Sequence, residues 1–115
     1  MNYKYKTFKE FYPFYLSEHM NPICRGLHFI GTLIIILIIL ISINNIKFLF
    51  LIPLIGYGFA WIGHFFFEKN KPATFKYPLY SLIGDWVMFK DIVIGKESIL
   101  KPKNIKNDKS KIKLY

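Results

Sequence analysis

Three histidines are the residues of this chain best suited to chemistry, and the 115 residues contain no others. His19, His28 and His64 each lie at one end of a hydrophobic stretch, beside acidic, amide or thiol side chains. Imidazole is the commonest protein ligand for metal ions, and placing it against apolar surface is unfavourable unless a partner compensates. The pattern therefore predicts a metal site at a membrane surface.

Two long hydrophobic segments would position these histidines. Residues 26–43 and 48–67 contain no Asp, Glu, Lys or Arg, and each is about as long as the ~20 residues that cross a hydrocarbon core. Because no continuous apolar stretch or small-residue cleavage site precedes them, we expect no secretory signal peptide. We predict transmembrane helices at about 22–43 and 47–67, joined by a short turn.

The turn would place two of the histidines at the same depth. In an antiparallel hairpin, residues equally far from the turn lie level, and the midpoint of 28 and 64 is 46. In one continuous helix His19 would lie on the opposite face from His28. Asn21 and Pro22 interrupt that helix, because the residue before a proline avoids helical dihedrals and asparagine caps a new helix. The three histidines are therefore predicted to meet near the open end of the hairpin.

Two further helices are predicted beside the hairpin. Thr7 and Glu10 fit a capping box, and aromatic residues recur after them at helical spacing, which indicates an amphipathic helix in the membrane interface. Residues 79–94 are apolar but interrupted by charges and short for a span, which indicates a second interfacial helix. The expected fold is an all-α membrane protein, a transmembrane hairpin flanked by two amphipathic or interfacial helices, in a single domain at 1–99.

The charges predict the orientation of this domain. The net charge of +9 comes mainly from the C-terminal third, and both open ends of the hairpin are rich in Lys and Arg, whereas only Lys47 lies near the turn. Both termini should therefore face the cytoplasm, from a bacterial inner membrane or the endoplasmic reticulum. The basic tail at 100–115 is expected to be disordered and to contact anionic lipid, with no nucleic acid as partner. A four-helix core is small for enclosing a lipid, which is compatible with a homodimer.

Acidic and sulfur side chains near the histidines are compatible with more than one metal ion. Glu68 shares a helix face with His64 and is either a fourth ligand or a group that orients an imidazole. Asp85 lies within an apolar segment, where its charge requires a partner. Cys24 precedes His28 by four residues. A thiolate would favour zinc, whereas imidazoles with a carboxylate and open positions suit non-haem iron that activates oxygen.

Two other classes of function fit the same residues. A non-catalytic membrane scaffold or lipid-binding protein would use its histidines for hydrogen bonds alone and would bind no metal. A zinc-dependent lipid hydrolase would combine Cys24 with the histidines. Metal identity separates that hydrolase from an oxygen-using enzyme, because zinc has no redox chemistry.

Four segments of the chain resemble a small family of membrane 2-hydroxy fatty acid dioxygenases. They are FYPFYLSEH at 11–19, CRGLHFIGT at 24–32, GHFFFEKNKPA at 63–73 and SLIGD at 81–85. The resemblance covers about residues 7–97. It implies an Fe2+-dependent enzyme that uses oxygen to shorten a 2-hydroxy fatty acid by one carbon and releases carbon dioxide.

The residues and the resemblance together give a hypothesis for the site. Four side chains are expected to hold or complete the iron site: His19, His28, His64 and Glu68. Asp85 is expected to act from behind these ligands, and Arg25 or Lys69 to pair with the substrate carboxylate. The acyl chain would stay in the bilayer while its polar head reaches the metal at the interface.

Overall fold

The computed structural model describes residues 4–102, and within that range every regular element is a helix. Four are α-helices: α1 (Phe8–Ser17), α2 (Pro22–Ser42), α3 (Leu51–Ile62) and α4 (Pro78–Val93). Three are shorter helices of other types: η1 (Ile46–Phe50), η2 (Gly63–Glu68) and η3 (Ala73–Phe75). The predicted all-helical fold is confirmed, whereas most of the predicted tail at 100–115 lies outside the described residues.

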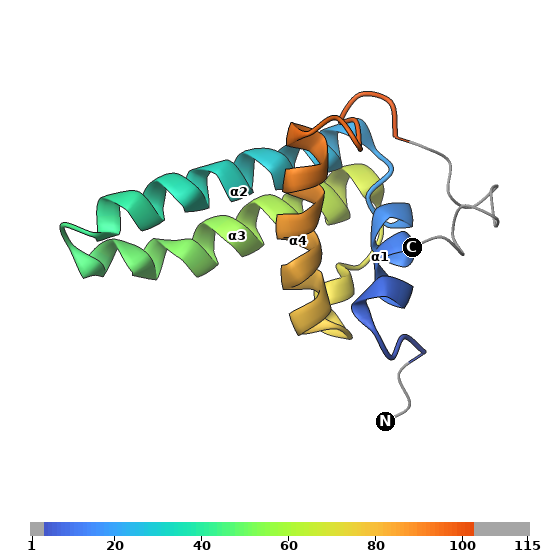
Figure 1. The fold of residues 1–115 in the computed structure, drawn as a ribbon, viewed down its shortest axis with the longest axis horizontal. Coiled ribbons are helices and arrows are strands. Elements are labelled where there is room, and N and C mark those ends of the chain that lie inside the picture. Colours follow the sequence, from blue (N-terminus) through green and yellow to red (C-terminus); the bar gives the residue numbers. More distant parts are fainter. Residues whose placement is uncertain (1–3, 103–115) are drawn as a thin grey trace.

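α2 and α3 form a long antiparallel pair (Figure 1). The Asn21 side chain accepts hydrogen bonds from the backbone N–H groups of the second and third residues of α2, and Pro22 takes the first position, as predicted. After α2 ends, Asn45 caps η1 in the same way. From there η1, α3 and η2 follow one another without a break. The runs Pro22–Ser42 and Ile46–Glu68 are both long and apolar enough to cross a membrane.

Much of the apolar surface of this pair has no protein cover. Within its bounds α3 buries no residue, and only 6% of the apolar window in its run is buried inside the structure. Phe50, Leu54 and Leu40 are 84%, 69% and 57% exposed. Soluble monomers rarely expose contiguous apolar patches of this extent, so the α2–α3 pair carries the kind of surface that contacts a membrane or another protein.

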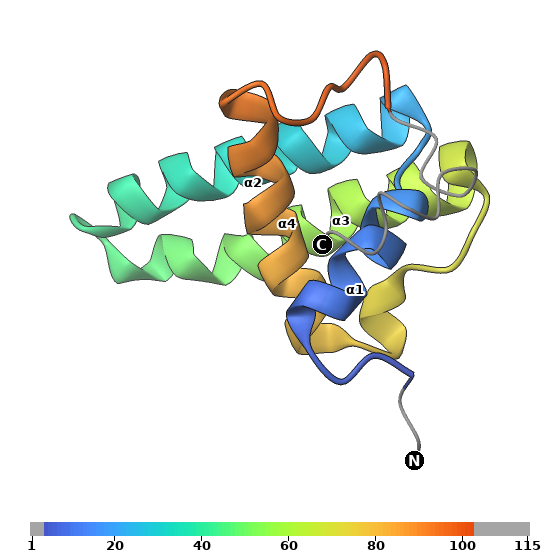
Figure 2. The same cartoon turned by 45° about the vertical axis from the view of Figure 1, so that its right-hand side comes forward.

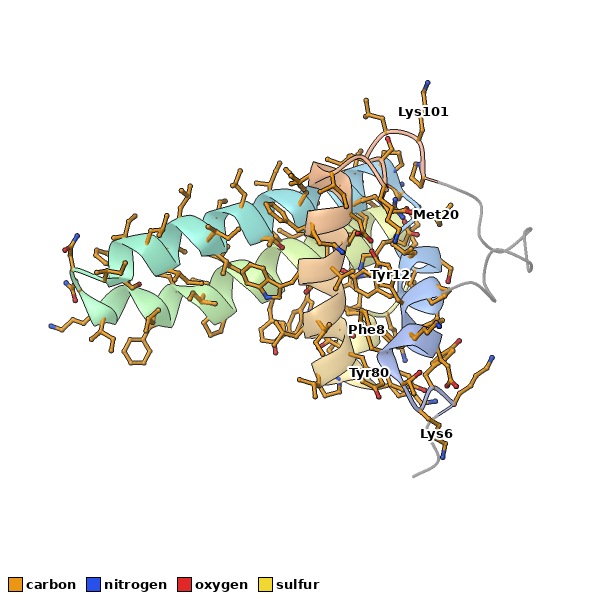
Figure 3. All side chains as sticks on the ribbon, viewed as in Figure 1. Lys6, Phe8, Tyr12, Met20, Tyr80 and Lys101 are labelled. Carbon is orange, nitrogen blue, oxygen red and sulfur yellow. The ribbon has the colours of Figure 1, made fainter. Side chains whose placement is uncertain are left out.

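α1 and α4 pack against each other across the open end of the pair, with α4 crossing it (Figures 1 and 2). Thr7 caps α1 as predicted, accepting from the Glu10 N–H at 3.2 Å, while the Glu10 carboxylate accepts from the Lys6 N–H. Phe8 stacks on Tyr12 and meets Tyr80 edge-on (Figure 3). The main core cluster consists of six side chains: Phe11, Tyr12, Tyr15, Leu16, Tyr77 and Met88. The aromatic face of α1 is therefore buried against α4, which fixes the position of the chain that leads to His19.

Candidate metal centre

The three histidines meet at the open end of the α2–α3 pair. His19 follows α1, His28 lies on α2 and His64 lies in η2. The Nε2 atom of His19 is 3.1 Å from Nε2 of His28 and 2.9 Å from Nε2 of His64. One ligand atom from each ring lies within 4.8 Å of the others, and all three side chains are buried. The break after α1 thus brings His19 to the other two histidines, as the sequence predicted.

The other ring nitrogen of each histidine has its own acceptor. His19 Nδ1 is 2.6 Å from the Tyr15 carbonyl oxygen, and His28 Nδ1 is 2.8 Å from the Cys24 carbonyl oxygen. His64 Nδ1 is 2.7 Å from Oδ1 of Asn70, whose amide group donates to Glu18. Since these oxygens can only accept, each Nδ1 carries the proton and each neutral ring keeps an unprotonated Nε2.

Three nitrogen lone pairs consequently face one another in a buried space. Burial, followed by the neighbouring His28 and His64, lowers the pKa of His19 well below its usual value. A shared proton is therefore a poor way to relieve the repulsion between the three lone pairs. A metal ion satisfies all three lone pairs. Imidazole nitrogens about 2.1 Å from one metal and at right angles lie about 3.0 Å apart, close to the separations found here. The donor set therefore fits a metal ion.

His64 lies in a short π-helix, η2, that continues α3. This wider turn ends at Lys69, the one non-glycine residue with positive φ (61°) in the described chain. The next residue, Asn70, places its side-chain Oδ1 beside Nδ1 of His64. The Asn70 backbone N–H also donates to the His64 carbonyl oxygen at 3.0 Å. π-Bulges inside α-helices are rare overall, and those that occur are often found at functional sites. The bulge is what lets a single asparagine orient the His64 ring.

Removing the Asn70 side chain should weaken the site without removing a ligand. In Asn70→Ala, His64 loses the acceptor that fixes its tautomer, and we expect metal affinity to fall by about 10–100-fold. Asn70→Asp keeps an acceptor oxygen and should retain more of the affinity. Competition with a coloured chelator measures both variants, and unchanged affinity in Asn70→Ala would contradict an orienting role.

A cavity of about 530 Å³ opens from the histidines between the α2–α3 pair and α4. Besides the three histidines, its polar lining residues include Thr32, Ser81 and Asp85. Its remaining lining is largely apolar, with Ile35 and Ile52 from the facing helices. A space of this size, largely apolar with a few polar side chains, suits an amphipathic small molecule.

Asp85 shares this cavity and is held by Tyr15. The Tyr15 hydroxyl donates to Asp85 Oδ1, and the Tyr15 ring stacks on the His19 ring with centroids 4.0 Å apart. Burial raises the pKa of Asp85 to about 7, although the hydrogen bond from Tyr15 opposes the shift. Asp85 therefore lies behind the histidines, connected to His19 through Tyr15, and its carboxyl group titrates near neutral pH.

Comparison with known proteins agrees with this geometry. The model of the family described as "2-hydroxy-palmitic acid dioxygenase Mpo1-like" matches residues 5–97, which include all three histidines, Asn70 and Asp85. The chain belongs to this family. Neither the curated proteins nor the solved structures contain a significant match. Family membership thus rests on a match that spans most of the chain.

Glu68, predicted as a fourth ligand or as a group that orients an imidazole, is bound to the backbone of the segment after His19. Its two carboxylate oxygens accept from the backbone N–H groups of Met20 and Asn21, at 2.7 and 2.6 Å. The group of potential ligands among the described residues contains the histidines alone. This geometry ties the segment after His19 to the end of η2. Glu68 as a metal ligand stays a prediction, and its observed contacts fit the alternative of an orienting group.

The two cations predicted to bind a substrate carboxylate lie away from the cavity lining. Arg25 is fully buried, and its Nη1 is 3.0 Å from Glu97 Oε1 in an ion pair, while its Nε donates to the His19 carbonyl oxygen. Lys69 is exposed at the end of η2. Their role toward a substrate stays a prediction, and the structure gives Arg25 the added task of holding the His19 backbone.

Cys24 packs beside the cluster without joining it. Its buried Sγ atom lies 3.8 Å from Nδ1 of His28, the ring nitrogen that does not face the other histidines. Gly63 lies against it so closely that an added Cβ would be 3.0 Å from that sulfur. Cys24 therefore contributes to the close approach of α2 and η2, and the group that could hold a metal among the described residues does not include it.

Proposed function

We propose that the protein is an Fe2+-dependent dioxygenase that shortens 2-hydroxy fatty acids by one carbon and releases carbon dioxide. The observation that carries this proposal is the convergence of three unprotonated Nε2 atoms in the lining of a largely apolar cavity. Membership of a family described by 2-hydroxy-palmitic acid dioxygenase supports the substrate class. His19, His28 and His64 would hold the iron.

The proposed reaction balances without an external reductant. One 2-hydroxy acid and one oxygen molecule give one fatty acid that is a carbon shorter, one carbon dioxide and one water. The bond between the carboxyl carbon and the hydroxyl-bearing carbon breaks, and all the electrons that reduce oxygen come from the substrate. A bound iron ion would supply the redox chemistry for oxygen and coordination for the hydroxyl and carboxylate oxygens.

The residues of the chain have three tasks in this proposal. The Tyr15 and Cys24 carbonyl oxygens and the Asn70 side chain keep the histidine rings in one tautomer and orientation. Apolar side chains of the cavity lining, such as Ile35 and Ile52, would limit the access of water to the reacting head of the substrate. Asp85, whose Oδ1 accepts from Tyr15, can take up or release a proton at Oδ2 near neutral pH.

The exposed surface of the α2–α3 pair supports a membrane location. A bilayer would cover the apolar side chains that no protein atom covers, and the two runs are long enough to cross it as a hairpin. The histidines and the packed helices α1 and α4 would then lie at the cytoplasmic side, where the basic residues and both termini are expected. A fatty acid could enter the cavity from the lipid with its head toward the histidines, and a second copy of the chain could cover part of the same surface.

Metal content and oxygen stoichiometry test the proposal. Protein purified without oxygen in detergent should contain about one iron per chain. With 2-hydroxypalmitic acid it should consume one oxygen for each carbon dioxide and each C15 acid formed, with no added reductant. Zinc with lipid hydrolysis would favour the hydrolase, and absence of metal after reconstitution would favour a non-catalytic scaffold or lipid-binding protein. Either result would overturn the dioxygenase.

A further inference from the structure

Ser81 carries a buried hydroxyl group that has no hydrogen-bond partner among the described residues. The residue is 6% exposed, lies on α4 and lines the cavity that the histidines share. Of the buried side-chain atoms in this condition, Ser81 Oγ is the one whose residue lines that cavity. Buried polar atoms in folded proteins nearly always have a hydrogen-bond partner. Because Ser81 lines the cavity, a molecule bound there can supply the partner that the protein does not.

The surroundings of Ser81 indicate what that partner is. Asp85 follows it by four residues on the same face of α4, and both line the cavity. Thr32 stands one turn after His28 on the α2 wall. Away from these side chains and the histidines the lining is largely apolar. A ligand that matches this distribution has an oxygen-rich head beside Ser81 and a hydrocarbon tail.

Among residues 4–102, which the structure describes, no lysine or arginine lines the cavity. The cations predicted to pair with a carboxylate are placed elsewhere, since Arg25 binds Glu97 and Lys69 is exposed outside the lining. A carboxylate bound here would therefore depend on the metal and on neutral hydrogen-bond donors. The hydroxyl of Ser81 is such a donor, and hydrogen bonds to an ionised oxygen are stronger than those between neutral groups.

We propose that Ser81 is a substrate-positioning residue whose hydroxyl donates a hydrogen bond to the carboxylate of the 2-hydroxy fatty acid. This inference rests on the proposed function, because it assumes that the acid binds with its head at the histidines. Ser81 on α4 would hold one oxygen of the head, while the histidines that line the same cavity would hold the metal that contacts the rest of it. The role predicted from the sequence for a cation then belongs to a neutral side chain.

Binding without turnover tests the proposal. The full-length, iron-loaded protein in detergent is titrated with 2-hydroxypalmitic acid in the absence of oxygen, and binding is followed by tryptophan fluorescence, to which Trp86 in the cavity lining contributes. Ser81→Ala should weaken binding by about tenfold, raise KM more than it lowers kcat and leave the iron content unchanged. Ser81→Thr keeps the hydroxyl and should bind nearly as the wild type does. Ser42→Ala removes a hydroxyl at the far end of α2, bonded to the Ile38 carbonyl oxygen, and serves as the control.

A second ligand identifies the group that Ser81 recognises. 1,2-Hexadecanediol carries the hydroxyl and the chain but no carboxylate, so its affinity should be the same for the wild type and Ser81→Ala. Equal weakening of acid and diol would overturn the carboxylate assignment, and unchanged affinity for the acid in Ser81→Ala would overturn the role of Ser81. If the wild type itself neither binds nor converts the acid, the proposed function fails and this inference fails with it.

Discussion

Replacing His64 by alanine should abolish both metal binding and turnover. The substitution removes one of the three Nε2 atoms that converge at the site, and it leaves Asn70 without the ring that it orients. Two imidazoles without the third are a poor site for a divalent ion in competition with buffer and detergent. Because a catalytic metal supplies several kcal/mol of stabilisation, we expect turnover to fall by more than about a thousandfold. Elemental analysis and oxygen uptake measure the two effects.

The matched variants separate loss of the site from loss of the fold. His19→Ala and His28→Ala should each behave as His64→Ala does, and the triple variant should be little worse than any single one, because groups that act as a unit are not additive. Lys71→Ala changes an exposed residue in the loop after η2 and should keep its iron. Helix content by circular dichroism should be the same in all of them. Full activity in His64→Ala would refute the assignment of the ligands.

The sequence was sufficient for the helices that carry the histidines. The apolar runs are long, and Asn21 with Pro22 is a strong local signal because the cap and the proline act on the same turn. Distance from the turn then predicted that His28 and His64 lie level, which requires only that the two helices be straight and antiparallel. Local and nearly one-dimensional rules of this kind can be applied without knowledge of packing.

The parts that the sequence did not reveal depend on contacts between distant segments. The π-helix at η2 changes the register after Gly63, so helical spacing alone paired Glu68 with His64 and missed Asn70. Glu68 accepts from two backbone N–H groups after α1, and no sequence pattern predicts a carboxylate bound to the backbone of another segment. Arg25 is similar, since its partner Glu97 lies 72 residues away. The string of polar residues from Glu68 to Asn70 was the one available signal.

Gly84→Ala should damage the metal site although residue 84 touches no metal ligand. A Cβ atom at this position would lie 2.8 and 2.9 Å from Cδ2 and Cε2 of the Tyr15 ring, closer than nonbonded carbons approach. The same ring stacks on the His19 ring, with centroids 4.0 Å apart. Tyr15 is buried, with 1% of its surface exposed, so the added methyl must displace the ring toward His19 or separate α4 from α1. Overpacking of this kind typically costs about 1–3 kcal/mol.

The displacement should reach the metal through two further contacts of Tyr15. Its carbonyl oxygen accepts from His19 Nδ1 at 2.6 Å, and its hydroxyl donates to Asp85. Moving Tyr15 therefore turns the His19 ring away from the other two, and metal affinity should fall together with the melting temperature.

Gly58→Ala is the matched control, because an added Cβ there meets nothing within 4 Å. It should leave the affinity unchanged and stabilise α3 by up to about 1 kcal/mol, the usual preference for alanine over glycine in a helix. Metal affinity by chelator competition and thermal unfolding in detergent give both quantities. Wild-type affinity in Gly84→Ala would mean that the stacked Tyr15 ring does not position His19, whereas loss in Gly84→Ala but not in Gly58→Ala assigns the effect to that contact.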